Sequence, residues 1–288
     1  MKLKIFIVLV AVVLAWVAGR SIKSGGQHIV RSVQQEAQGN GHGGETTHPG
    51  ETATTTSGGS ERRINESYEL ADDAQVDVHG INGPVTVETV DGNTAEVHVT
   101  STARNRSDLD ANQIIIQHTG ARLTVRGKGS NNWGFWKWLR GGGEARHNVL
   151  LKLPRRAELA LSGTNGRVTI GETEGAVRVS GVNGPVEMGA TRGFAEVSGV
   201  NGSVTLIITE LDERGLRVHG VNGGVELRLG SDVNADLSIN GVNGRMTLEA
   251  PNVEVQEQKR DKLRARIGTG GAGIKVNGIN GSVRLVGV

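Results

Sequence analysis

The sequence predicts an all-β fold, a β-solenoid in which short repeats stack on one another. Three observations support this prediction: a glycine-rich and aliphatic composition, a unit repeated at nearly constant spacing, and a regular alternation of apolar residues within each unit. Gly accounts for 44 of the 288 residues, Pro for only 5 and aromatic residues for 3%. Abundant glycine without a collagen period indicates a β-structure with many turns rather than disorder. The scarcity of aromatic residues predicts a thin, aliphatic core.

Residues 1–19 are expected to form an export signal or a membrane anchor. A short basic start precedes an unbroken apolar run at residues 5–18, which has the length of a signal-peptide core and is short for a transmembrane helix. Small residues up to Gly19 favour cleavage, whereas Trp16 is typical of a retained segment at a membrane interface. Both alternatives place the rest of the chain outside the cytoplasm.

Residues 20–63 are expected to form a flexible spacer rich in Gly, Thr and Ser. His, Gln and Glu make up much of the remainder. Such a stretch cannot bury enough apolar surface to offset the entropy lost on ordering. It would hold the folded region away from the membrane.

Residues 64–288 contain a repeated unit, Gly-[Val/Ile/Thr]-Asn-Gly-x-[Val/Met]. Successive units in the middle of the region begin 18 or 21 residues apart, and fixed periods near 20 residues are typical of stacked supersecondary units. At about 20 residues per coil the region predicts roughly eleven coils. The last two units begin 37 residues apart, and we expect one degenerate coil between them. The units begin at Gly80, Gly163, Gly181, Gly199, Gly220, Gly241 and Gly278.

Apolar residues alternate within each unit and change parity at its first glycine. Val177 and Val179 share one parity, and after Gly181 the apolar positions become Val182 and Val186. Because side chains alternate between the faces of a strand, the switch requires a bend or bulge, which Gly tolerates. Stacked units would therefore align their aliphatic residues in internal columns.

Two architectures satisfy this pattern. In a solenoid each unit is one coil and Asn-Gly marks a corner, whereas in a hairpin array Asn-Gly is a type I′ turn between antiparallel strands. The near-constant unit length favours the solenoid. Stacking would place the asparagines in register, where their amides can hydrogen-bond along a ladder that faces either inward or outward. The asparagines are Asn82, Asn165, Asn183, Asn201, Asn222, Asn243 and Asn280.

Three segments carry a resemblance to a known family. Val76–Val87 is similar to the opening repeat of the putative-adhesin β-strand-repeat proteins of bacteria, a family with a domain of unknown function. Arg122–Val125 is similar to the middle strand of that family, and Val149–Pro154 to the segment that leads into its regular repeats. The resemblance covers about residues 64–288. It implies a right-handed β-helix-like fold and an extracytoplasmic setting, and it supplies no catalytic residues.

An aromatic insertion at residues 127–143 interrupts the repeats. It holds three of the four Trp residues of the chain, bounded by glycines. Exposed aromatic clusters mark contacts with membranes, glycans or proteins. The alternative is that the insertion caps or flanks the solenoid, whose ends must be covered. The candidate contact residues are Trp133, Phe135, Trp136, Lys137, Trp138 and Arg140.

A second departure from the repeat, Gln256–Arg266, is dense in charged residues. We expect it to belong to the degenerate coil or to an outward loop. The charges then form a solvated face rather than a binding patch.

No constellation of residues predicts catalysis, a metal site or a cofactor. Cysteine is absent, which excludes disulfides, thiolate ligands and cysteine nucleophiles. Glu187, Glu196 and Glu226 fall on the polar parity of different units, where solvated strand residues are expected. His79 and His219 share a slot that other units fill with Ser or Asn, which disfavours a metal site. A formal net charge of +2 gives no global field for nucleic acid.

We therefore expect a non-enzymatic, exported β-repeat scaffold, an adhesin or cell-envelope interaction protein, in the periplasm or at the cell surface. Its partner would be an envelope glycan, a membrane surface or another envelope protein, without nucleic acid or cofactor. The alternative is a carbohydrate-active β-helix enzyme acting on polysaccharide, which requires two carboxylates roughly 5–10 Å apart in a groove. A membrane-tethered sensor would need a longer cytoplasmic tail than the few residues before Ile5.

Overall fold

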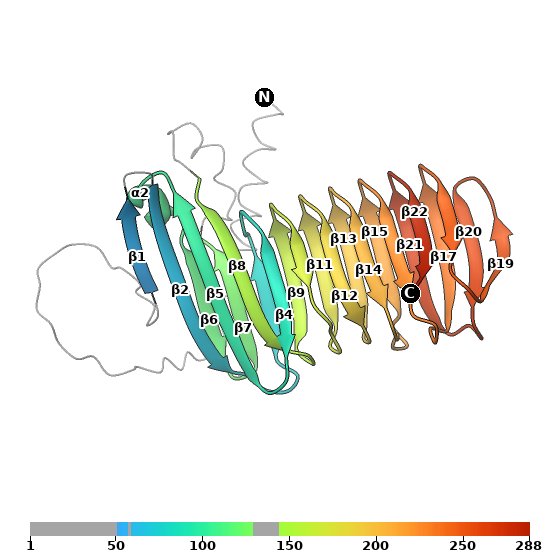
Figure 1. Ribbon diagram of the computed structural model, residues 1–288, viewed down its shortest axis with the longest axis horizontal. Coiled ribbons are helices and arrows are strands. Elements are labelled where there is room, and N and C mark those ends of the chain that lie inside the picture. The colour runs from blue at the N-terminus through green and yellow to red at the C-terminus, as the bar shows by residue number, and fades with distance from the viewer. Residues whose placement is uncertain (1–50, 57–58, 129–143) are drawn as a thin grey trace, which may run out of the picture. The chain divides into compact units, whose positions relative to one another are not determined.

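The computed structural model describes residues 51–56, 59–128 and 144–288. They lie in one compact unit, Thr47–Val288. Its described elements are β-strands apart from one six-residue helix, α2 (Arg106–Ala111). The strands form two 11-stranded sheets, shown in Figure 1. The all-β prediction is confirmed, and the predicted signal or anchor at residues 1–19 lies outside the described residues.

In the middle of the unit, successive strands alternate between the two sheets, here called sheet A and sheet B. Each strand pairs in parallel with the strand one repeat later in its own sheet. Sheet B contains β9 (Glu158–Thr164), β11 (Val177–Val182), β13 (Ala195–Val200) and β15 (Leu216–Val221). Sheet A contains β10 (Val168–Ile170), β12 (Val186–Thr191), β14 (Val204–Ile208) and β16 (Val225–Leu229).

This pairing excludes the hairpin array in the central repeats. Val200 pairs in parallel with Val182 on one side and with Val221 on the other. The strands that flank each central Asn-Gly, such as β13 and β14, belong to different sheets. Asn-Gly is therefore a corner between sheets.

Aliphatic side chains fill the space between the sheets, in the alternation that the sequence predicts. Val177, Val179, Val182 and Val186 are all buried. The first glycine of each of the seven units has a φ between 59° and 68°, a left-handed conformation that favours glycine. The parity switch at these glycines is confirmed as a backbone bend.

The N-terminal end departs from the regular order. The first repeat, β3 (Gln75–His79) and β4 (Val85–Val90), has as its outer neighbours β7 (Arg122–Gly127) and β8 (Arg146–Pro154), which pair with it in parallel. Antiparallel strands then extend both sheets outward. These strands are β1 (Glu51–Thr56), β2 (Gly59–Glu69) and β5 (Thr94–Ala103) in sheet A and β6 (Ile114–Thr119) in sheet B.

The predicted end of the spacer at residue 63 is wrong, because β1 and the first part of β2 lie before that residue. Antiparallel pairing with β5 satisfies the backbone of β2. The inward positions at the start of β2 are the buried, polar Ser60 and Arg62. A strand that buries polar residues lacks the apolar alternation by which a sequence reveals a strand.

The C-terminal end contains a change in stacking order. The last repeat, β21 (Ala272–Ile279) and β22 (Val283–Gly287), lies between β15 and β16 on one side and the preceding repeat, β17 (Ala235–Val242) and β18 (Met246–Glu249), on the other. Figure 1 shows β21 and β22 between strands that precede them in the chain. The final repeat is therefore inserted into the stack rather than added to its end.

The predicted degenerate coil is also wrong. Its residues form an antiparallel hairpin, β19 (Val253–Gln258) and β20 (Lys262–Ile267), and both strands belong to sheet B. β20 pairs antiparallel with β17 and extends that sheet beyond the repeat of β17 and β18. Eight of the eleven described strands in each sheet pair in parallel, so the region has fewer coils than the eleven expected. The antiparallel strands at the ends account for the difference.

Candidate functional site

An asparagine ladder follows the corner at which strands pass from sheet B to sheet A. From the second member onward, each side-chain amide nitrogen donates to the side-chain oxygen of the asparagine before it in the stack, at 2.8–3.2 Å. The side chains are exposed except for the half-buried Asn82, so the ladder faces outward. In stacking order its members are Asn82, Asn165, Asn183, Asn201, Asn222, Asn280 and Asn243.

The ladder is a structural feature rather than a recognition site, because its amides hydrogen-bond mainly to one another. Each amide between the two ends of the ladder uses one N–H and one lone pair on its neighbours, which fixes the orientation of the side chain. The first member, Asn82, donates to the carbonyl oxygen of Ala145 at 2.9 Å. The sequence predicted the ladder but missed its order, because Asn280 accepts from Asn243 and donates to Asn222.

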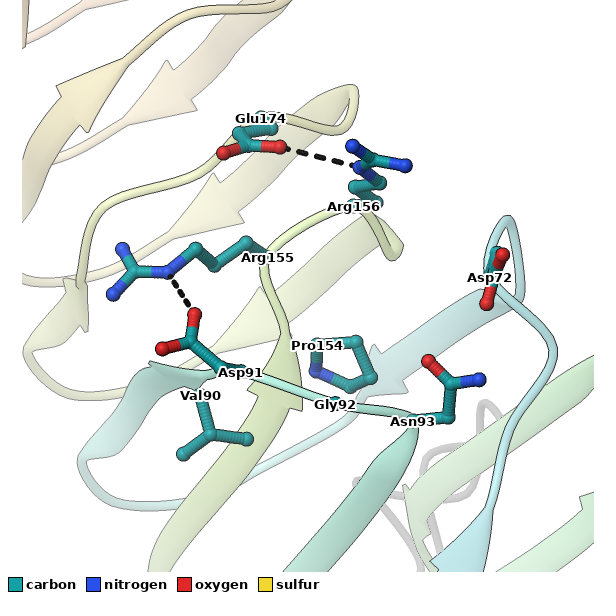
Figure 2. Close-up of a pocket in the computed structure, with 9 residues that line it drawn as sticks. All are labelled: Asp72, Val90, Asp91, Gly92, Asn93, Pro154, Arg155, Arg156 and Glu174. Atoms are coloured by element: carbon teal, nitrogen blue, oxygen red, sulfur yellow. Dashed lines mark hydrogen bonds and ion pairs between the residues drawn. The ribbon is translucent and has the colours of Figure 1, made fainter.

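A pocket of about 320 Å³ lies at the other edge, beyond the ends of β4 and β8. Figure 2 shows Arg155 directed toward Asp91 and Arg156 toward Glu174. The Nε of Arg155 lies 2.9 Å from Oδ1 of Asp91, and the Nε of Arg156 lies 3.4 Å from Oε2 of Glu174. The hydrogen bond with Asp91 raises the pKa of the Arg155 guanidinium. The pocket is thus lined by paired charges.

Further ion pairs connect Arg155 to residues of the next two repeats. Glu172 accepts from Arg155 and from Arg192, both at 2.9 Å. The side chain of Asp91 is 90% exposed, so water solvates its charge. The charged and polar lining of this pocket suits the binding of a polar group.

Sheet B carries a cluster of guanidinium groups on its outer face, here called the guanidinium platform: Arg178, Arg214 and Arg217 around Phe194. Their Cζ atoms lie 5.1, 5.3 and 5.1 Å from the centroid of the Phe194 ring. The ring is only 2% exposed, because the arginine side chains cover it. Cation–π attraction of about 0.5–1 kcal/mol per exposed pair holds the guanidinium groups near one another. The sequence analysis missed this cluster, since its members come from three separate repeats.

Two of the carboxylates that the sequence placed on the polar parity share a register position: Glu187 of β12 and Glu226 of β16 lie two strands apart, on either side of Thr205. Glu187 pairs with Arg167, and Glu226 lies 2.6 Å from Nε of Arg228, both on sheet A. Glu196 belongs to β13 of sheet B. Strand spacing puts Glu187 and Glu226 about 9.6 Å apart, each bound to an arginine, and Glu196 lies on the other sheet.

The two histidines that share a position in the repeat unit are also far from each other. His79 and His219 occupy one register position on β3 and β15, with serines of the three intervening strands between them. Four strand spacings amount to about 19 Å, which is too far for one metal ion. Within residues 51–56, 59–128 and 144–288, no cluster of three or more His, Asp or Glu side chains could hold a metal.

Two polar contacts near the N-terminal end involve buried side chains of the strands. Arg62, 4% exposed, contacts Asp110 of α2 at 2.5 Å. The Oγ of Ser101 and Nδ1 of His147 are 2.8 Å apart, and each residue is 3% exposed. A serine beside a histidine can act as a nucleophile and base, but burial closes this pair to a polymer. The alternation of apolar and polar residues could not identify these side chains, because it assigns every polar residue to the outer face of a sheet.

The predicted aromatic contact residues, Trp133 to Arg140, lie outside the described residues. Across the part of the chain that the structure does describe, no helix is long and apolar enough to span a bilayer. The apolar run at residues 5–18 falls outside that part.

No family model matches the chain, and no curated protein matches its sequence. Similar solved structures include a putative cell adhesion protein from Clostridium sporogenes, at 10% identity and TM-score 0.33 over 78% of this chain and 100% of that one. A putative adhesin from Bacteroides fragilis has 9% identity and TM-score 0.27, covering 78% and 97%. A putative lipid binding protein from Parabacteroides distasonis has 10% identity and TM-score 0.24, covering 78% and 95%. The chain is thus similar to solved structures described as putative adhesins.

Proposed function

We propose that this chain is an exported, non-enzymatic scaffold of the cell envelope, built on a right-handed β-solenoid. The observation that supports it best is the parallel, in-register pairing of eight strands in each sheet, which repeats exposed polar positions at a fixed spacing. A connection between parallel strands of one sheet is right-handed in roughly 98% of cases. The function is that of an adhesin or envelope interaction protein.

The proposed organisation follows from the sequence and the first described strand. Residues 1–19 export or anchor the chain, and a spacer begins at residue 20. The β-repeat region begins with β1 at Glu51. Cell fractionation should recover the repeat region outside the cytoplasm. Its recovery in the cytoplasm from cells that make the intact chain would contradict export.

The scaffold and the polysaccharide-cleaving alternative are separated by one experiment. The full-length chain is incubated with isolated cell envelopes and, in parallel, with soluble polysaccharides. A scaffold should be retained on envelopes without generating new reducing ends. Sustained release of reducing ends, abolished by replacing one carboxylate, would establish the enzyme instead.

The aromatic insertion is a proposed contact of this scaffold. Trp side chains beside cations suit lipid headgroups or acidic glycans, because they combine apolar area with charge attraction. Replacing Trp133, Trp136 and Trp138 together by Ala should weaken envelope retention and leave the thermal unfolding midpoint unchanged. If the insertion is a cap, the same variant should instead lose stability, and the tryptophan emission of the parent should be blue-shifted and protected from quenchers.

A further inference from the structure

We propose that the guanidinium platform on the outer face of sheet B binds acidic polysaccharides. This inference rests on the proposed function as an envelope-binding scaffold and assigns it a surface and a ligand class. The ligand is a polymer with carboxylate or sulfate groups that lies along the stacking direction of the strands.

The platform belongs to a row of cationic side chains at one register position. Arg178, Arg217 and Lys275 occupy this position on β11, β15 and β21, with Glu196 of β13 between the two arginines. Strand spacing puts the arginines about 9.6 Å apart and Lys275 about 4.8 Å beyond Arg217. The row therefore offers repeated positive charges to a linear anion.

Two of the platform arginines are not held in an ion pair. Arg214 pairs with Asp212 at 2.7 Å. Arg178 and Arg217 are exposed, and within the described residues neither has a carboxylate at ion-pair distance. Glu196, their neighbour in the row, lies 3.3 Å from Nε2 of His219. The guanidinium groups of Arg178 and Arg217 are thus available to an external anion.

The Phe194 ring restricts the positions of these groups before a ligand arrives. Packing of Arg178 and Arg217 against it at 5.1 Å limits the freedom of two long side chains. A guanidinium fork matches the two oxygens of a carboxylate or sulfate. Because less side-chain entropy is lost on binding to an ordered fork, the arrangement favours association.

A second row beside the cationic one favours a polysaccharide over other anions. Ser180, Ser198, His219 and Asn277 occupy the register position two residues further along the same strands. Their hydroxyl, imidazole and amide groups can donate to and accept from sugar hydroxyls. A cationic row next to a neutral polar row fits a chain that carries both acidic groups and hydroxyls.

The same face is poorly suited to a membrane. Binding to a bilayer surface requires apolar side chains that insert among the lipids as well as positive charge. In the described residues the large hydrophobic side chains that are exposed are Val255 and Val288. Neither belongs to the two rows, so the platform presents charge and hydrogen-bonding groups without an apolar anchor.

The test measures binding of the full-length chain, in mild detergent, to heparin and polygalacturonate, with dextran as the uncharged polysaccharide. The parent should bind both acidic polymers and not dextran. The double variant Arg178→Ala, Arg217→Ala should weaken this binding by roughly twofold to thirtyfold, the loss expected for two solvent-exposed charge contacts. Replacing both arginines by Lys keeps the charge without the fork and should give an intermediate affinity.

The matched control is Arg167→Ala, Arg228→Ala, which removes the same charge from sheet A. It should bind as the parent does. All variants should keep the parent's circular dichroism spectrum, and Arg178→Ala, Arg217→Ala should lower the thermal unfolding midpoint because it uncovers Phe194. Equal weakening by the control, stronger arginine-dependent binding to anionic lipid vesicles, or no binding to either acidic polymer would overturn the proposal. Envelope retention is measured in parallel: if it persists without polymer binding, the platform assignment alone fails, and if both are absent the proposed function fails too.

Discussion

At the scale of single residues, each position of the Gly-x-Asn-Gly unit meets a different physical requirement. The first glycine adopts a positive φ, the next residue is buried between the sheets, and the asparagine joins the ladder. The second glycine is required by close approach. A Cβ atom on Gly202 would lie 2.4 Å from the carbonyl oxygen of Gly184, a backbone atom that cannot move aside alone.

The change Gly202→Ala tests this account of the second glycine. Because the neighbouring coil must shift to admit the methyl group, we expect a loss of about 1–3 kcal/mol in the free energy of unfolding. Gly120→Ala is the control, since nothing lies within 4 Å of its Cβ position. Chemical denaturation of the two variants should give clearly different midpoints. Equal midpoints would show that the coils are not in such close contact.

At the scale of elements, the sequence predicted the strands whose inward residues are aliphatic. The strands from β9 to β16 follow the predicted alternation. The end strands could not be predicted in this way, because β2 buries Ser60 and Arg62 and β19 leaves Val255 exposed. Antiparallel partners, rather than alternation, define both strands. The guanidinium platform escaped prediction for a related reason, since only the register of the coils brings Arg178 and Arg217 to one ring.

The hairpin of β19 and β20 predicts a dependence of stability on pH. Hydrogen bonds from Lys259 and Lys262 lower the pKa of Glu257 from 4.5 to about 2. The charged carboxylate is therefore favoured by folding, so this contribution is present above about pH 4.5 and is lost as the pH falls through about 2. Glu257→Gln should lower the thermal unfolding midpoint at neutral pH.

The difference between Glu257→Gln and the parent should shrink steadily between pH 4.5 and pH 2. Glu254→Gln, on the same strand, is the control because within the described residues Glu254 has no ion pair at 4 Å or less. A difference for Glu257→Gln that stays constant down to pH 2 would contradict the assigned ion pairs.

At the scale of the whole repeat region, the stacking order differs from the chain order. The last repeat has a neighbour on each side, because β21 lies between β15 and β17. The units are nearly equivalent in sequence, so alternation and spacing could predict that they stack but not which unit lies next to which. The stack therefore requires β21 and β22 to enter between repeats that precede them in the chain.

Disulfide trapping tests this order and the parallel register most directly, since the chain contains no cysteine. His219 is in register with Asn277, and Asn277 is in register with Asn240. Bridged Cα atoms are usually 4.4–6.8 Å apart, a distance that adjacent strands meet at about 4.8 Å and that strands two places apart exceed.

The full-length double variant His219→Cys, Asn277→Cys should therefore form an intrachain disulfide on mild oxidation, measured by mass spectrometry of peptides from the monomer. His219→Cys, Asn240→Cys should remain reduced. A disulfide in the second variant and none in the first would contradict the inserted repeat, and none between adjacent register partners would contradict the stacked fold itself.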